Sequence, residues 1–151
     1  KKGIRKIQNF SPLKGRGNIV KKSKKITLID DSYNSNPISL KNSLYFLSEY
    51  KNNSKKVAVI GDMLELGKFS KKKHEDIGKY INTINIDKAY TIGKESKRIF
   101  HQLDPSKRGY CYKNIKAFQK EFDKLMVANS IILFKSSNSV GLYKFLNNKI
   151  Y

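Results

Sequence analysis

The chain has 151 residues, with 32 Lys and Arg against 12 Asp and Glu, so its formal net charge at pH 7 is +20. This length fits one domain that can bury a core of its own, and the single cysteine excludes an internal disulfide. No apolar run is long enough to span a membrane, and the first residues lack the apolar stretch of a secretory signal. We therefore expect a soluble, cytoplasmic domain.

The positive charge first indicates a nucleic acid or an anionic membrane as a partner. However, 28 of the 32 basic residues are lysines and only 4 are arginines. Arginine is the residue best suited to bidentate contacts with phosphates and bases, and the lysine clusters lie where solvated positions are expected. We therefore interpret the lysines as surface positions and expect no specific nucleic acid partner and no membrane span.

Short, continuous apolar runs rich in β-branched residues are typical of strands that are buried on both faces of a parallel sheet. Such runs cover residues 26–29, 57–60, 89–92 and 131–134, and a weaker strand is expected at 110–112. The turn-rich residues 1–18 fit this pattern poorly. We therefore expect residues 1–18 to be a linker that leads in from another domain, and residues 19–151 to form the domain itself.

Segments with helical spacing of apolar residues lie between these runs. They cover residues 37–50, 71–84 and 115–127, with shorter helices near 95–102 and 139–148. Asn36, Ser70 and Asn114 are the candidate N-caps of the three longer helices. Strands that alternate with helices predict an α/β fold, namely a Rossmann-like, doubly wound and mostly parallel sheet with helices on both faces.

Polar residues or glycines follow each of the four clear strands, at residues 30–34, 61–62, 93–94 and 135–139. Each of these loops could simply cap the next helix. However, the carboxyl ends of parallel strands meet at one edge of a sheet, where ligands bind in open α/β folds. Together they predict a polar site for an anionic ligand at that edge.

No phosphate-binding motif is complete. Gly93-Lys94-Glu95-Ser96 has Glu where a P-loop needs Ser or Thr, and Gly15-Arg16-Gly17 follows no strand and lacks the third glycine of a dinucleotide motif. The spacing of His74, His101 and Cys111 is not that of metal ligands. We expect His74 at a packed or surface position of a helix, and Cys111 to be a small apolar residue. We therefore expect no catalytic residue and no metal ligand in this chain.

Four segments resemble motifs of the MurF type of the Mur ligase family. Residues 30–37, D-D-S-Y-N-S-N-P, resemble its D-D-S-Y-N-A-N-P signature, and residues 10–17, F-S-P-L-K-G-R-G, are similar to F-x-P-x-x-G-R-G. Residues 61–67, G-D-M-L-E-L-G, followed by His74 and Gly78, resemble G-D-M-L-E-L-G…H-x-x-x-G. Residues 135–139, K-S-S-N-S, are similar to K-G-S-[RN]-S. The four motifs occur in the family's order and cover nearly the whole chain.

The resemblance implies that the chain is the C-terminal domain of a three-domain, ATP-dependent ligase of peptidoglycan precursor synthesis. Such a ligase adds D-Ala-D-Ala to UDP-MurNAc-tripeptide through an acyl phosphate. ATP and Mg²⁺ would be held mainly by a central domain, and the N-terminal and central domains would be the partners of this one. The resemblance therefore implies that the chain alone is inactive and binds none of these ligands by itself.

The resemblance also implies roles for individual residues. Arg16 matches the arginine that approaches ATP, and Asp31 matches the aspartate associated with the ribose. Residues expected at a rim near the incoming dipeptide are Asn34, Asp62, His74, Lys135, Ser137 and Asn138. Ser136 stands where the family usually has glycine, and it would distort the loop if that position required a positive φ.

An alternative class remains open, in which the chain is a free-standing α/β module that binds nucleotides or nucleic acid. The reading frame upstream of Lys1 separates the two hypotheses, because a ligase requires a central domain with G-x-x-G-K-[ST] there.

Overall fold

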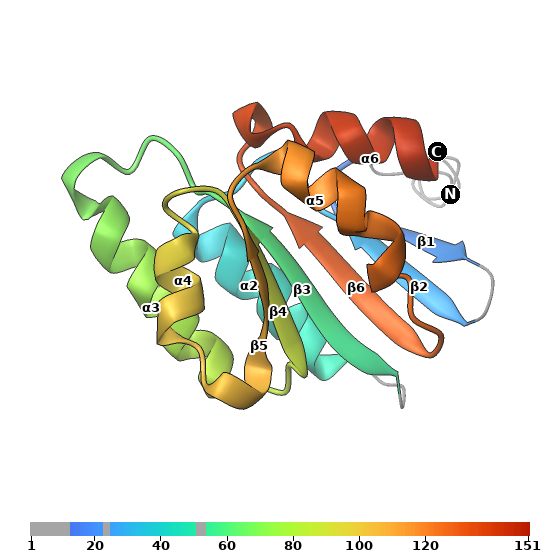
Figure 1. Ribbon diagram of the computed structural model, residues 1–151, viewed down its shortest axis with the longest axis horizontal. Coiled ribbons are helices and arrows are strands. Elements are labelled where there is room, and N and C mark those ends of the chain that lie inside the picture. The colour runs from blue at the N-terminus through green and yellow to red at the C-terminus, as the bar shows by residue number, and fades with distance from the viewer. Residues whose placement is uncertain (1–12, 23–24, 51–53) are drawn as a thin grey trace, which may run out of the picture.

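The computed structural model describes residues 13–22, 25–50 and 54–151, which build a six-stranded sheet flanked by helices (Figure 1). The strands are β1 (Asn18–Lys22), β2 (Ile26–Asp30), β3 (Lys55–Gly61), β4 (Lys88–Ile92), β5 (Arg108–Tyr112) and β6 (Ser130–Lys135). Their order in the sheet is β1-β2-β6-β3-β4-β5, and only the pairing of β1 with β2 is antiparallel. The predicted mostly parallel, Rossmann-like sheet is confirmed.

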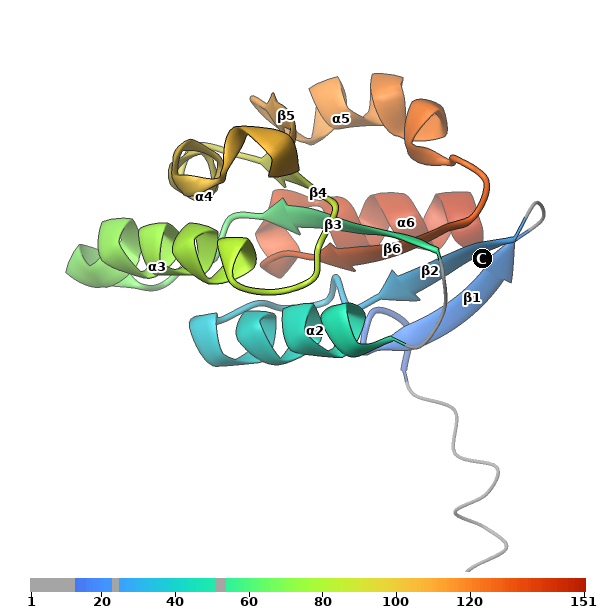
Figure 2. The same ribbon diagram turned by 90° about the horizontal axis from the view of Figure 1, so that it is seen from below.

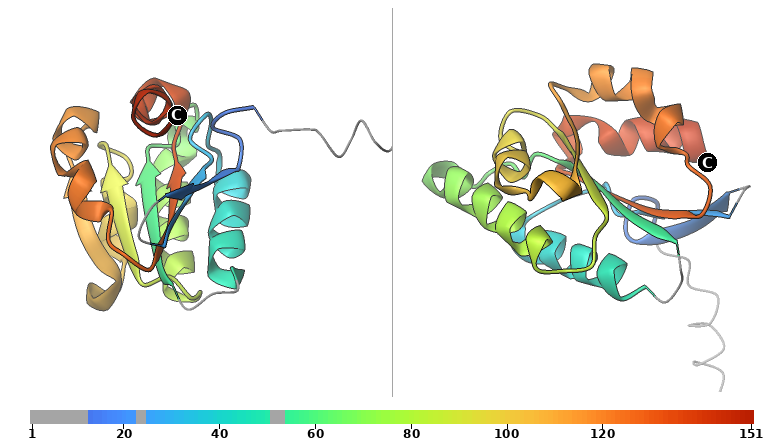
Figure 3. Two further views of the ribbon diagram at one scale, coloured as in Figure 1. Left: turned by 90° about the vertical axis from the view of Figure 1, so that its right-hand side faces the viewer. Right: turned by 60° about the horizontal axis from the view of Figure 1, so that its bottom comes forward.

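Helices cover both faces of the sheet (Figures 2 and 3). Those on one face are α2 (Pro37–Glu49), α3 (Ser70–Asn82) and α4 (Lys97–Gln102), and those on the other are α5 (Ile115–Glu121) and α6 (Leu142–Ile150). Successive residues of β3 alternate between two apolar clusters, since Ala58 belongs to the cluster that includes Leu44 of α2 while Val59 belongs to the cluster that includes Phe118 of α5. The central strand is therefore buried on both faces, as its continuous apolar run predicts.

Two of the three predicted N-caps are confirmed. The Asn36 side chain accepts a hydrogen bond from the backbone N–H of Ser39 at 2.8 Å, and Asn114 caps α5 in the same way through Ala117 at 3.0 Å. The prediction for Ser70 is wrong, because a 3₁₀ turn at Gly67–Phe69 leads directly into α3 and leaves Ser70 inside the helical run.

Two further differences concern segments that have weak local signals. β1 lies in a lysine-rich stretch from which we predicted no strand; it is a largely exposed edge strand, where lysines are common. The helix expected at residues 115–127 ends as an α-helix at Glu121 and continues as a 3₁₀ turn over Phe122–Leu125. Within the described ranges, no helix has the length and apolar character needed to cross a membrane.

Candidate functional site

The loops that follow β2, β3, β4 and β6 meet at the carboxyl edge of the sheet, as the sequence predicts. The Lys135 ammonium at the end of β6 forms an ion pair with Asp31 Oδ2, after β2, at 2.7 Å. The backbone oxygen of Asp62, after β3, accepts from the N–H of Ser137 at 3.0 Å, and its Oδ1 accepts from the N–H of Ser96 at 2.6 Å. Polar contacts thus join all four loops.

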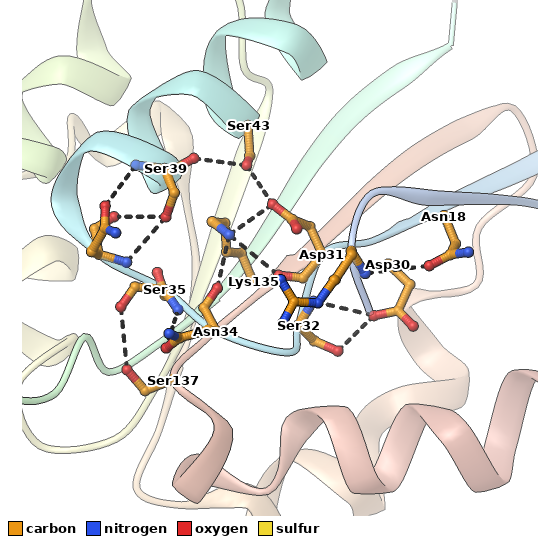
Figure 4. Close-up of polar contacts among 12 residues, drawn as sticks. Asn18, Asp30, Asp31, Ser32, Asn34, Ser35, Ser39, Ser43, Lys135 and Ser137 are labelled. Atoms are coloured by element: carbon orange, nitrogen blue, oxygen red, sulfur yellow. Dashed lines mark hydrogen bonds and ion pairs between the residues drawn. The ribbon is translucent and has the colours of Figure 1, made fainter. Parts of the chain in front are cut away.

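Lys135 and Asp31 are neighbours in one cavity of about 420 Å³, which we call the Arg16 cavity. It lies between the loop after β2, the start of α2 and the loop around Gly15. Figure 4 shows Lys135 beside Asp31, with Ser43 of α2 reaching the same carboxylate. The Asp31 carboxylate is thus oriented by the Lys135 ammonium and by the Ser43 hydroxyl, which donates to Oδ2 at 2.6 Å.

The Lys135 side chain is 2% exposed, so its charge is almost completely removed from water. Its ammonium donates to the backbone oxygens of Asn34 at 2.9 Å and of Asp31 at 3.4 Å, in addition to the ion pair. A buried ammonium is tolerated only when its N–H groups have partners of this kind. Lys135 therefore fastens the loop after β2 to the end of β6.

Arg16 reaches the rim of the Arg16 cavity from the segment before β1. Its guanidinium lies over the Tyr33 ring, 4.4 Å from the ring centroid. Gly15, at φ +75°, brings the backbone close to this ring: its carbonyl accepts from the N–H of Tyr33 at 2.9 Å. A side chain at Gly15 would collide with Tyr143, whose Cδ2 would be 2.6 Å from the added carbon. Arg16 is exposed and available to an anion.

The structure separates the two adjacent aspartates after β2. Asp30 is fully buried, where Oδ1 accepts from the Ser32 hydroxyl at 2.6 Å and Oδ2 accepts from the Tyr151 hydroxyl at 3.2 Å. Asp31 lines the Arg16 cavity and its side chain is 24% exposed. Of the two, only Asp31 lines the Arg16 cavity, and its assignment to a ribose stays a prediction.

A second cavity of about 600 Å³ lies beside the first, and we call it the Ser137 cavity. Residues 33–36 line both cavities. The remaining walls of the Ser137 cavity come from the loop after β3, at Leu64, Glu65 and Leu66, and from Ser137, Asn138 and Ser139 after β6. Of the predicted rim residues, Asn34, Ser137 and Asn138 line this cavity, and Lys135 lines the Arg16 cavity together with Asn34.

Asp62 and His74, the two other predicted rim residues, line neither cavity. Asp62 faces the loop after β4, where a carbon added at Gly93 would lie 2.4 Å from its carboxylate. His74 is fully buried, and its Nε2 accepts from the backbone N–H of Met63 at 3.1 Å. Its Nδ1 forms a hydrogen bond of 2.8 Å with the backbone oxygen of Ser70. Both residues hold the loop after β3 in place.

Ser137 connects the loops beneath the Ser137 cavity. Its hydroxyl accepts from the N–H of Leu64 at 2.9 Å and donates to the backbone oxygen of Ser35 at 3.4 Å, a contact drawn in Figure 4. Nearby, the Ser70 hydroxyl donates to Glu95 at 2.9 Å. This hydrogen bond, with the Arg98 guanidinium, holds the pKa of Glu95 below its usual value against the opposing effect of burial. The site therefore rests on a connected set of polar contacts.

Three residues of this edge were missed by our reasoning from the sequence. Ser43 lies one helical turn after Ser39, so the spacing of α2 could have placed it beside the loop after β2. Ser35 is 4% exposed, and its hydroxyl has no hydrogen-bond partner among the described residues. Glu65 has a left-handed backbone with φ 62°, which no residue-type signal predicts for a glutamate.

No group of three or more His, Cys, Asp and Glu residues that could hold a metal ion occurs in the described part of the chain. Two carboxylates of this edge already have partners, since Asp31 contacts Lys135 and Ser43 and Asp62 accepts from Ser96. The two cavities therefore offer hydrogen-bonding groups, an arginine and the carboxylate of Glu65 to a ligand.

Comparisons with known proteins identify a family for this chain. A family profile described as "Mur ligase, glutamate ligase domain" matches residues 15–138. The chain is 32% identical over 141 residues to UDP-N-acetylmuramoyl-tripeptide–D-alanyl-D-alanine ligase of Rickettsia prowazekii, covering 93% of this chain and 31% of that protein. It is 26% identical over 138 residues to the ligase of the same name from Bacillus subtilis, covering 87% and 30%.

Solved structures of MurF ligases share the fold. The MurF ligase from Thermotoga maritima in complex with ADP matches with a TM-score of 0.74 and 26% identity, over 92% of this chain and 31% of that one. A MurF structure from Acinetobacter baumannii matches with a TM-score of 0.82 and 24% identity, over 97% and 33%. The chain thus spans about a third of the length of these proteins.

Proposed function

Because the chain belongs to the Mur ligase family, we propose that it serves as the C-terminal domain of a MurF-type, ATP-dependent ligase. In this proposal the domain closes over a nucleotide held by a central domain and helps to bind the incoming D-Ala-D-Ala. The observation that carries it is the placement of Arg16 and Asp31 on one cavity at the carboxyl edge of the sheet. Residues 1–18 would lead in from the central domain.

In the proposed nucleotide site, Arg16 meets a phosphate and Asp31 meets the ribose. A guanidinium forms charge-assisted hydrogen bonds with phosphate oxygens, and an ionised carboxylate after a strand accepts from sugar hydroxyls. The Lys135 ammonium and the Ser43 hydroxyl support this role, since both contact Asp31 Oδ2 and hold the carboxylate at the wall of the cavity. The Thermotoga maritima relative was solved with ADP. Together these observations favour the Arg16 cavity as the edge of the nucleotide site.

The Ser137 cavity is the proposed site of the incoming dipeptide. It adjoins the Arg16 cavity along residues 33–36, so a bound amine would lie near the nucleotide side. Asn34, Ser137 and Asn138 supply amide and hydroxyl groups to its walls. Asp62 and His74 would contribute indirectly, by holding the loop after β3. The name shared by the Rickettsia and Bacillus relatives supplies the identity of the dipeptide.

The phosphates of ATP and any Mg²⁺ require groups beyond those described here. The chain has no complete P-loop, and its described residues form no cluster of metal ligands. We therefore propose that the central domain holds the triphosphate and the metal, while this domain excludes water and aligns the amine on closure. The domain alone is then expected to bind ATP weakly and to show no turnover.

The test is Arg16→Ala in the full-length ligase. Loss of one charge-assisted contact of roughly 1.5–3 kcal/mol corresponds to a decrease of about 10- to 150-fold in kcat/KM for ATP. The melting temperature should stay nearly constant, because Arg16 is exposed. Lys41→Ala is the matched control, since it also removes a cation that lies over a tyrosine ring, that of Tyr80, outside both cavities. An unchanged kcat/KM in Arg16→Ala would contradict the proposal.

A further inference from the structure

The Ser137 cavity differs from the Arg16 cavity in the sign of its charge. Among the described residues, Glu65 is the only charged one on the walls of the Ser137 cavity, whereas the Arg16 cavity has two cations, Arg16 and Lys135, and one carboxylate, Asp31. A lone carboxylate in a cavity is unexpected in a chain where 32 basic residues face 12 acidic ones. By charge, the Arg16 cavity favours an anion and the Ser137 cavity favours a cation.

From this contrast we infer that Glu65 binds the ammonium group of the acceptor dipeptide and thereby selects for an acceptor with a free amine. The inference rests on the proposed function, which places the dipeptide in the Ser137 cavity, and it adds a residue that the motif comparison did not assign. Glu65 is a specificity-determining residue in this scheme, because its carboxylate recognises the charged amine before the reaction.

The backbone at Glu65 supports a role beyond simple loop geometry. Its φ of 62° lies in the left-handed region, which costs of order 1–3 kcal/mol for residues other than glycine and occurs most often at functional sites. Glycine would adopt this conformation at lower cost. Two hydrogen bonds hold the loop in this shape, one from Met63 N–H to His74 and one from Leu64 N–H to Ser137.

A second group in the same cavity points to a ligand with N–H donors. Ser35 lines the Ser137 cavity and is 4% exposed, and its hydroxyl has no partner among the described residues. A buried hydroxyl without a partner costs free energy unless a ligand or water supplies one. An ammonium group has three N–H donors, and the oxygen of a serine hydroxyl can accept from one of them.

The chemistry of the acceptor fits this pair. An α-amino group has an ordinary pKa of about 8, so the dipeptide carries an ammonium group at neutral pH. A carboxylate forms a short, charge-assisted hydrogen bond with such a group, about twice as strong as a bond between neutral partners. An N-acylated dipeptide lacks this charge and should gain nothing from Glu65.

The test is Glu65→Gln in the full-length ligase, with KM measured separately for each substrate. We expect KM for D-Ala-D-Ala to rise about tenfold, the equivalent of about 1.4 kcal/mol, while KM for ATP stays within about twofold. Inhibition by N-acetyl-D-Ala-D-Ala should be equal in the variant and the unmodified enzyme. Glu49→Gln is the matched control, because it removes the same charge from an exposed position at the far end of α2.

A second variant, Glu65→Gly, separates recognition from backbone geometry. It relieves the left-handed strain and also removes the carboxylate, so we expect an equal or higher melting temperature together with the same rise in KM for D-Ala-D-Ala. If the unmodified enzyme ligates D-Ala-D-Ala and both variants keep the same KM for it, the role of Glu65 is overturned but the proposed function is not. An unmodified enzyme that does not ligate D-Ala-D-Ala would overturn the proposed function itself.

Discussion

The α-carbon of Gly61, at the end of β3, lies directly against the side chain of Ser136 after β6. A carbon added at Gly61 would lie 2.5 Å from Ser136 Cβ and 3.1 Å from Val140 Cγ1. Ser136 occupies the position where the resemblance implies glycine, yet it is fully buried and is not among the residues with positive φ. The loop therefore holds this serine without left-handed strain, and the lack of a side chain at Gly61 leaves room for the Ser136 side chain.

This contact predicts that Gly61→Ala destabilises the domain by about 1–3 kcal/mol through overpacking. Adding Ser136→Gly should restore part of that loss, because it removes the closer of the two clashes and leaves the contact with Val140. A double-mutant cycle by urea unfolding of this chain measures the coupling. Strictly additive effects of the two changes would show that the side chains do not compete for the same space.

The buried ion pair between Lys135 and Asp31 predicts that removing the aspartate alone destabilises the domain more than replacing both residues. Asp31→Asn leaves the Lys135 ammonium 2% exposed without its counter-charge, and loss of one partner of a buried pair costs roughly 3–5 kcal/mol. We expect about 2–4 kcal/mol here, because the Asp31 side chain is partly exposed and two backbone oxygens still accept from Lys135. The pair of changes Asp31→Asn with Lys135→Met should unfold at a higher urea concentration than Asp31→Asn alone. If it does not, the uncompensated lysine is not the cause.

The assignment of His74 to loop support predicts an effect on stability. His74→Phe fills a similar volume but leaves the buried N–H of Met63 without an acceptor, which costs about 1–3 kcal/mol. His101→Phe, at an exposed position on α4, is the matched control and should change the free energy of unfolding by less than about 0.5 kcal/mol. Equal small effects of the two changes, measured by urea unfolding, would contradict a supporting role for His74.

The buried phenol of Tyr112 predicts the alkaline limit of stability. Burial, helped by the neighbouring Tyr90, raises the pKa of Tyr112 to about 12 from 10.0. Because this folded pKa lies above the unfolded one, the contribution to stability is complete below pH 10 and is lost as the pH rises from 10 to 12. The free energy of unfolding of Tyr112→Phe, measured over this range, should fall less steeply than that of the unmodified chain. If the free energy of unfolding falls equally steeply with pH in both proteins, the raised pKa of Tyr112 is contradicted.

Structural features that depend on residues close to one another in the sequence could be predicted from the sequence alone. The continuous apolar runs identified β2, β3, β4 and β6, because a strand buried on both faces needs apolar side chains at successive positions. Asn36 and Asn114 identified two helix starts, because a cap bonds an N–H only three residues away. The meeting of the polar loops also followed, since parallel strands place their carboxyl ends at one edge.

Which residues line the two cavities was decided only by the tertiary structure. Arg16 and Asp31 share a cavity, whereas His74 is buried beneath a loop and Glu65 from that loop lines the Ser137 cavity. The sheet order places β6 between β2 and β3, so Lys135 reaches Asp31, 104 positions earlier in the chain. Local sequence signals extend over a few residues, whereas the placement of a loop side chain depends on which distant strands pair and how closely their loops pack.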